Sequence, residues 1–316
     1  MLERCVRDQW SVNDLDWSRK PKAMNADDEM AFVQLFTDMA AIERLAAALF
    51  REQGKRCKDP TLRAIFDTFI VDEFRHSQCA QMLADYYDVH HHKNYRTCPE
   101  LTAFTPHFID AVQYVSDDVA NAYITGGELM LDIALLRSIN DYVADDMSNE
   151  AMRLINRDES RHIAIDYHMV EYYASSAYTR DLETRPKAAF LTRAKAFRAF
   201  AGVIYFARPF FKRVFFEPME RVDPSGVRLR EAIKRFQALR AKPGVVDRPF
   251  AKFMLNVQRT YEHPLLGRLF EPLLVRMAGV EPQFVRQLNT EAELAHAATM
   301  TFEELANEAL ALKNAN

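Results

Sequence analysis

Residues that interrupt helices or cross-link chains are scarce in this sequence. Only 8 of its 316 residues are glycine, and the four cysteines, Cys5, Cys57, Cys79 and Cys98, are scattered with no C-x-x-C pair. Scattered cysteines are typical of a reduced protein and argue against a rubredoxin-type iron site or a ferredoxin domain within this chain.

Signals for export and for membrane insertion are also missing. The N-terminal residues hold no apolar run of signal-peptide length, and no stretch of eighteen uncharged apolar residues occurs. We therefore expect a cytoplasmic protein without a transmembrane segment. The net charge of −4 is small and points to no particular partner.

Apolar residues, by contrast, are abundant and periodic. They make up 49% of the chain, and their recurrence at intervals of three and four predicts an all-α protein. Four long helices are expected at about 27–53, 60–87, 106–143 and 148–176. Shorter helices are expected at 226–241, 248–262, 264–278 and 291–313, and Pro209 is expected to kink or break its segment.

These helices predict three parts: an N-terminal arm (1–26), a four-helix bundle (27–178), and accessory helices packed on the bundle (179–316). A loop between the second and third long helices carries His90, His91 and His92. An exposed polar turn is the preferred interpretation of these three histidines, with metal binding as the alternative.

One five-residue word occurs twice in the bundle region. It reads Asp72-Glu73-Phe74-Arg75-His76 and then Asp158-Glu159-Ser160-Arg161-His162. Glu and His three residues apart lie on one face of a helix and can bind the same ion. Two further glutamates, Glu43 and Glu128, precede the two words by 30 and 31 residues. One Glu from each of two helices and one Glu-x-x-His from each of two others is the ligand set of a dimetal four-helix bundle.

The chemistry of this set favours iron or manganese. Four carboxylates supply hard oxygen ligands and two imidazoles supply nitrogen. Two divalent ions would balance the four carboxylate charges, and so few nitrogen ligands leave positions open. A structural zinc site would be closed and usually contains cysteine.

The residues beside the ligands predict a supporting network. A metal-bound histidine normally donates its second N–H to a carboxylate, a carbonyl or water. On a helix, Asp72 points about 100° away from Glu73, toward a neighbouring helix. We therefore expect crossed pairs, Asp72 with His162 and Asp158 with His76, and expect Arg75 and Arg161 to hold the two aspartates.

Two adjacent glycines, Gly126 and Gly127, precede Glu128 inside a predicted helix, where each costs about 1 kcal/mol relative to alanine. Close approach of another helix explains them as well as room for substrate or dioxygen, or a local bulge at the metal. Thr125 and Asp132 flank Glu128 on nearly the same face and are candidates to line a cavity.

The doubled D-E-x-R-H word resembles that of the diiron-carboxylate oxygenases of the ferritin-like superfamily. These include bacterial multicomponent monooxygenase hydroxylases, acyl-carrier-protein desaturases and aerobic oxidative cyclases. The resemblance covers about residues 27–176 and does not extend to 180–316. The N-oxygenase branch carries an additional histidine four residues before the last ligand glutamate, where this chain has Ile155, so that branch is disfavoured.

This resemblance implies two Fe ions and O2 as co-substrate. The ligands and catalytic residues that it implies are Glu43, Glu73, His76, Glu128, Glu159 and His162, supported by Asp72, Arg75, Asp158 and Arg161. It also implies an organic substrate, small or bound to a carrier protein, that is hydroxylated, desaturated or N-oxidised. No flavin or iron–sulfur motif is visible, so electrons are expected from a separate reductase or ferredoxin.

The stretch 192–242 holds 13 Lys or Arg against 4 Asp or Glu, interleaved with aromatic residues. A half-buried helix with a solvated basic face is slightly preferred over a surface for nucleic acid, a membrane or an acidic partner. For an acidic carrier protein or ferredoxin, Arg230, Lys234 and Arg235 are the docking candidates. Nucleic acid is not expected as a partner, and a homodimer is left open. Alternative functions are a dimanganese or Mn/Fe oxidase with the same ligands, and a ferritin-like protein for metal storage or peroxide scavenging.

Overall fold

The computed structural model describes residues 1–91 and 96–314. About 80% of the chain is helical, and the described residues contain no strand. The prediction of an all-α protein is therefore confirmed. Of the three loop histidines, His90 contacts Glu29, with 2.7 Å between Nδ1 and Oε2, and His92 lies outside the described residues.

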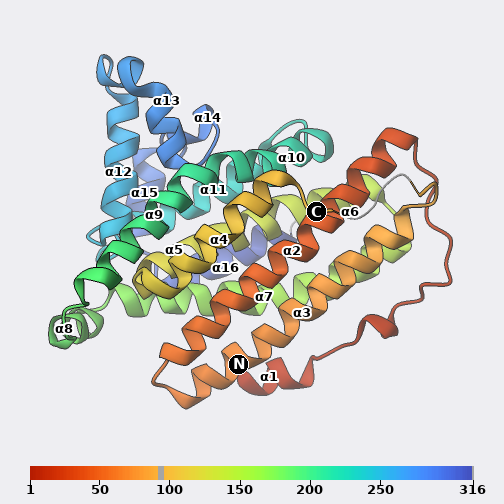
Figure 1. Cartoon of the computed structure of the whole chain (residues 1–316), viewed down its shortest axis with the longest axis horizontal. Helices are drawn as coiled ribbons and strands as arrows, with labels where there is room; N and C mark the ends of the chain where they lie inside the picture. Colours follow the sequence, from red (N-terminus) through yellow and green to blue (C-terminus); the bar gives the residue numbers. More distant parts are fainter. Residues whose placement is uncertain (92–95, 315–316) are drawn as a thin grey trace.

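Four long helical segments pack along one another in the part of the molecule that carries the doubled word (Figure 1). They are α2 (Ala26–Arg56), α3 (Pro60–Tyr87), the run α5–η2–α6 (Asp117–Val143) and α7 (Asp146–Ala174). Side-chain caps begin three of them: Asn25, Asp59 and Asp145 each accept a backbone N–H of the first turn. Fully buried residues such as Phe36, Leu83 and Ile155 fill the space between them.

The third long helix differs from the prediction at its start. Residues 99–114 form a separate helix, α4 (Pro99–Tyr114), which contains Pro106. Val115 and Ser116 are extended, and α5 (Asp117–Glu128) begins after them with two aspartates in its first turn. Acidic residues favour a helix N-terminus through the helix dipole. The periodic pattern runs across this break because both helices are buried on one side.

The helix widens directly after Glu128. Residues Leu129–Leu136 form a π-helix, η2, before the α-helical α6 (Arg137–Val143). At the glycine pair, a Cβ on Gly126 would lie 3.4 Å from the Phe236 ring, whereas a Cβ on Gly127 would meet nothing within 4 Å. Gly126 thus permits a close approach and Gly127 lies against open space, beside a local bulge of the kind that the sequence suggests.

The N-terminal arm packs on the long helices. Its two short elements, α1 (Leu2–Arg7) and the 3-10 turn η1 (Val12–Asp14), both contact α3. Within the arm, the Trp17 indole N–H donates to the carbonyl of Val12 at 2.7 Å.

The residues from Ser176 onward form a second group of helices, which we call the C-terminal layer. Its elements are α8 (Ser176–Thr184), α9 (Phe190–Phe211), the π-helix η3 (Lys212–Phe216), α10 (Glu217–Val222), α11 (Val227–Arg240), α12 (Pro249–Glu262), α13 (Leu266–Ala278), α14 (Pro282–Val285), α15 (Glu291–Thr299) and α16 (Phe302–Asn314). Pro209 lies inside α9, and the helical path continues through η3 and α10 instead of ending. The helix predicted at 291–313 is two helices, which separate at Met300 and Thr301.

The basic stretch is largely used within the molecule. Seven of the thirteen Lys and Arg side chains of 192–242 form ion pairs with Asp or Glu. Lys234 pairs with Glu293 on α15 and Arg235 with Glu308 on α16. Two of the three candidate docking residues therefore hold the C-terminal helices together, and only Arg230 is exposed without an ion pair among the described residues.

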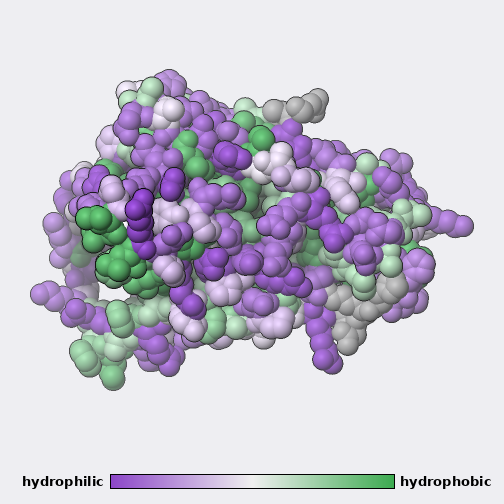
Figure 2. Space-filling model, turned by 90° about the horizontal axis from the view of Figure 1, so that it is seen from above, coloured by the Kyte–Doolittle hydropathy of each residue, from purple (hydrophilic) through white to green (hydrophobic). Residues whose placement is uncertain are grey.

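Two regions of the molecule are notably apolar, one in its interior and one on its surface. By length and composition, Asp117–Val143 could cross a membrane, but 72% of its apolar window is buried inside the protein, as in a core helix. Figure 2 shows exposed apolar side chains at the end of the molecule where Figure 1 places α12 and α13. Leu265, Leu269 and Leu273 are among the exposed apolar residues of that region.

The two glycines predict different responses to alanine. Alanine is about 1 kcal/mol better than glycine inside a helix, and the Cβ of Gly127→Ala has free space. We expect Gly127→Ala to raise the free energy of unfolding by about 0.5–1 kcal/mol, and Gly126→Ala to gain less because the Phe236 ring must shift. Urea unfolding of both variants measures this. A loss of stability in Gly127→Ala would contradict the open space.

Candidate metal centre

The six predicted ligands come together in one buried cluster. Each lies on the helix that the spacing predicts: Glu43 on α2, Glu73 and His76 on α3, Glu128 at the end of α5, and Glu159 and His162 on α7. Their exposed fractions are 5% or less. Residues from four helices, up to 119 positions apart in the sequence, therefore share one water-poor interior.

Two overlapping groups of side-chain atoms make up the cluster. One consists of Glu43, Glu73, His76 and Glu159, the other of Glu73, Glu128, Glu159 and His162. Within each group, one atom of every residue lies within 4.8 Å of the others. Glu73 and Glu159 belong to both groups, so two positions for a cation lie side by side and share two carboxylates.

Both histidines turn the same ring atom inward. Nδ1 of His76 lies 2.9 Å from Glu159 Oε1, and Nδ1 of His162 lies 2.8 Å from Glu159 Oε2 and 3.2 Å from Glu73 Oε1. Nε2 of each ring points the other way, to an aspartate. That orientation leaves Nδ1 as the atom that faces the shared carboxylates.

The aspartates contact the histidines in the crossed arrangement that the sequence predicts. Asp158 Oδ2 lies 3.2 Å from His76 Nε2, and Asp72 Oδ2 lies 3.6 Å from His162 Nε2. Arg161 donates to Asp158 at 2.7 Å and to Asp72 at 3.3 Å, while Arg75 donates to Asp72 at 2.9 Å. Arg75 also lies 3.5 Å from Asp158, so each arginine connects the two copies of the motif. Asp158 is within hydrogen-bond distance of His76, whereas Asp72 lies beside His162 at ion-pair distance.

The N-terminal arm completes this network, which the sequence did not reveal. The Trp10 indole N–H donates to Asp158 at 2.6 Å, and the Gln9 amide donates to Asp72 at 3.0 Å. Both contacts join residues more than 60 positions apart. A tryptophan in a polar N-terminal segment is a weak signal for packing, but nothing local identifies its partner.

Aromatic rings close the apolar side of the cluster. The Phe69 ring centroid lies 4.1 Å from that of His162, and the Phe50 ring lies 5.2 Å from it at a steep angle. Both phenylalanines are fully buried. They keep water from the imidazole and lower the local dielectric, which strengthens every charge interaction in the cluster.

The buried charges shift one another's proton affinities. Burial raises the pKa of Glu43 and of Glu128 well above the ordinary value, and repulsion by Glu73 and Glu159 adds to the effect. Burial opposes protonation of His76 and His162, but the charge of Glu159 and the hydrogen bonds to the surrounding carboxylates together outweigh it and raise the pKa of both imidazoles. Without cations, the cluster therefore holds protons in order to offset its negative charge.

The donor set fits cations. Many of its inward-facing atoms are buried and have no hydrogen-bond partner: Glu43 Oε1, both oxygens of Glu73 and of Glu159, Glu128 Oε2, and Nδ1 of both histidines. Buried polar atoms are normally satisfied. So many buried ligand-type atoms without hydrogen bonds, pointing at one place, could hold positive ions between them.

The remaining candidates take different positions around Glu128. Thr125 and Asp132 are buried, at 1% and 0% exposure, and Thr125 donates to the carbonyl of Asn121 at 2.8 Å. Gly126 and Gly127 line a cavity between α5 and the C-terminal layer.

Two residues near the cluster have roles that the sequence does not predict. Lys313 on α16 is buried beside Asp132, with 3.2 Å between Nζ and Oδ2, and donates to the Asn156 carbonyl at 2.6 Å. Asp166 lies one turn after His162, and neither of its buried oxygens has a hydrogen-bond partner. Burial raises its pKa well above the ordinary value. Only the fold brings Lys313 here, from 151 positions beyond His162.

No protein-family model matches the chain, and neither a curated protein nor a solved structure matches it. The function is therefore inferred from the cluster itself.

Loading this cluster with divalent ions is expected to release protons. Glu43, Glu128, His76 and His162 have raised pKa values in the metal-free protein, and cations displace those protons. We expect release of about two to four protons per chain near pH 7, and an affinity that falls as the pH is lowered. Calorimetry in buffers of different ionisation enthalpy measures the number. Loading without proton release would show that the charge balance is wrong.

The buried Lys313–Asp132 pair gives a stability prediction. Lys313→Met leaves Asp132 without its ammonium partner, and we expect a loss of about 2–3 kcal/mol. This loss is smaller than the loss when one partner of a buried ion pair is removed and the other stays charged, because the Asp132 carboxyl can take a proton. Adding Asp132→Asn should recover part of the loss, and urea unfolding of the two single variants and the double variant measures the coupling.

The pH dependence of that loss has a definite sign. Burial raises the pKa of Asp132 to about 7 in the folded chain, above its unfolded value, so ionising it costs stability as the pH rises toward 7. Without Lys313 the pKa rises further, and Lys313→Met should keep losing stability above pH 7. An equal loss at pH 5 and pH 8 would contradict an ionic pair.

Proposed function

We propose that the protein is a non-haem diiron oxygenase or oxidase, built on a ferritin-like four-helix bundle, that uses dioxygen to oxidise an organic substrate. One observation carries the proposal. Two groups of buried ligand atoms share Glu73 and Glu159, and each group is completed by one histidine and one further glutamate. Shared carboxylates suit two ions held close together rather than one closed structural site.

The residues divide naturally between two ions. Glu43 and His76 would hold one, Glu128 and His162 the other, and Glu73 and Glu159 would contact both. Oxygen-rich ligands with one imidazole per ion favour iron or manganese over zinc. Two iron ions in this setting would supply the reduction of dioxygen.

The surrounding side chains support this use. Asp158 and Asp72 orient His76 and His162, and Arg161 holds both aspartates. Phe50 and Phe69 exclude water from one side. Asp132, with its pKa raised to about 7, and Asp166 are buried carboxyl groups near the ligands that are able to hold a proton at neutral pH. Storage of iron has less need of such an ordered supporting network.

The balance of the reaction requires a partner. Insertion of one oxygen atom from O2 consumes two electrons and two protons and releases one water. The described residues provide carboxyl groups for proton transfer, but the electrons must come from a separate donor such as a reductase or a ferredoxin. We propose a small or carrier-bound organic substrate.

Metal stoichiometry and oxygen uptake test the proposal. The wild-type chain should bind two Fe(II) and consume O2. Glu159→Gln removes a shared ligand and should impair both ions, whereas Glu43→Gln should impair one more than the other. Glu171→Gln is the matched control, because Glu171 is an exposed glutamate on the same helix, α7. We expect each of these two variants to bind the affected ion at least about tenfold more weakly than the wild type.

The outcomes separate the alternatives. Two bound ions with O2 uptake that depends on Glu159 support the oxygenase. Tight binding of manganese with no oxygen reaction of the iron form would favour a manganese or mixed-metal oxidase with the same ligands. Rapid peroxide breakdown or mineral loading would favour scavenging or storage. The absence of stoichiometric metal would refute the dimetal site.

A further inference from the structure

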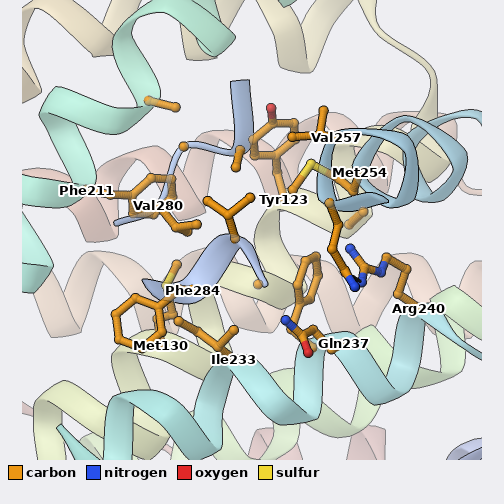
Figure 3. A pocket seen from close by; sticks show the side chains of 18 of the residues that line it. Tyr123, Met130, Phe211, Ile233, Gln237, Arg240, Met254, Val257, Val280 and Phe284 are labelled. Carbon is orange, nitrogen blue, oxygen red and sulfur yellow. Dashed lines mark hydrogen bonds between the residues drawn. The ribbon is translucent and has the colours of Figure 1, made fainter. Parts of the chain in front are cut away.

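A large cavity lies between α5 and the C-terminal layer. The empty space within it is about 900 Å³, including open solvent at its mouth. Its walls are mostly apolar and include Tyr123, Met130, Phe211, Met254 and Phe284. Figure 3 shows most of these side chains around the space, with Arg240 and Gln237 grouped on one side of it. The cavity is thus apolar with one polar end.

The Arg240 guanidinium at that end has no carboxylate partner. Its Nη2 donates to Gln258 Oε1, its Nε is buried without a hydrogen bond, and it forms no ion pair among the described residues. Burial lowers its pKa to about 10, although the charge of Glu262 opposes this effect. Desolvating a guanidinium is costly unless it is paired.

In the described part of the chain, the acidic neighbours form no ion pair with Arg240. Glu262, whose charge acts on Arg240, accepts hydrogen bonds from the Gln258 side chain and from Gln287 N–H, and Asp118 only lines the adjoining cavity.

Both polar groups of the Gln237 side chain already bind the backbone. Its amide donates to the Arg286 carbonyl at 2.9 Å, and its oxygen accepts from Leu288 N–H at 2.8 Å. Nearby Lys234 and Arg235, on the same helix α11, both have glutamate partners. Arg240 is therefore a cation directed at an apolar space, with donors to spare.

A second, smaller cavity shares Arg240, Phe236 and Phe250 with the first. It lies between α5 and α7, encloses about 540 Å³ including open space, and reaches Thr125. Thr125 is one turn before Glu128 on α5. The guanidinium therefore stands where two cavities meet, and Thr125 lines the second of them.

We propose that Arg240 binds the carboxylate of a monocarboxylic acid whose apolar body fills this cavity. A planar guanidinium suits a carboxylate because two parallel N–H groups match its two oxygens. One unpaired cation calls for one negative charge, and walls that are otherwise apolar except for the Tyr123 hydroxyl call for a hydrocarbon or aryl body. The claim that this acid is the substrate that is oxidised rests on the proposed function. The claim that Arg240 binds it does not.

Binding of a matched pair of probes tests the proposal. Dodecanoate and dodecanol have the same chain and differ in the charged head, and calorimetry measures the affinity of each for the full chain. We expect the wild type to prefer the acid, and Arg240→Gln to weaken acid binding by about tenfold or more while alcohol affinity changes less than about twofold. Arg230→Gln is the matched control, an exposed arginine on the same helix α11, and should change neither.

Three outcomes overturn the proposal: no binding of the acid, equal affinity of the wild type for acid and alcohol, or an unchanged affinity for the acid in Arg240→Gln. Circular dichroism verifies the fold of the variant, and if it fails to fold, the comparison of acid with alcohol in the wild type still decides. The measurement is repeated with and without bound metal. Acid binding in a chain that takes up no iron would refute the proposed function and leave the Arg240 site standing.

Discussion

An excess of buried negative charge dominates this molecule. Four glutamates and two histidines meet in an interior that admits almost no water, where an uncompensated carboxylate is too costly to persist. Raised pKa values of Glu43 and Glu128 show the charge being offset by protons. The same arrangement could hold cations in their place. Helix positions, histidine orientation and aromatic walls all follow from the need to hold that charge in one defined place.

Both halves of the chain contribute to enclosing this centre. The arm before α2 brings Gln9 and Trp10 to the two aspartates that orient the histidines. The last helix, α16, brings Lys313 to Asp132 on the π-helix that follows Glu128. The C-terminal layer is therefore attached to the centre by a buried ion pair, and it also supplies Arg240 and most of the apolar cavity walls.

The grouping of the six cluster residues was predictable because it depends on local features of the sequence. Glu-x-x-His depends only on the pitch of a helix, and the long helices depend on an apolar period that the sequence displays. The crossed aspartates followed from the same helical geometry. Trp10, Lys313 and Arg240 were not predictable, because each acts on a partner brought close by tertiary packing. The extended break at Val115 and Ser116 was missed because buried apolar residues continue on both sides of it.

The position of Lys313 has a consequence for how the protein is made. His162, the last of the six ligands, precedes Lys313 by 151 residues. At a synthesis rate of about 5–20 residues per second, roughly 8–30 s pass between the two. During that interval all six side chains of the cluster have been made, while the helix that covers Asp132 has not. On the proposed function, this order of synthesis would let ions reach the cluster before α16 covers Asp132.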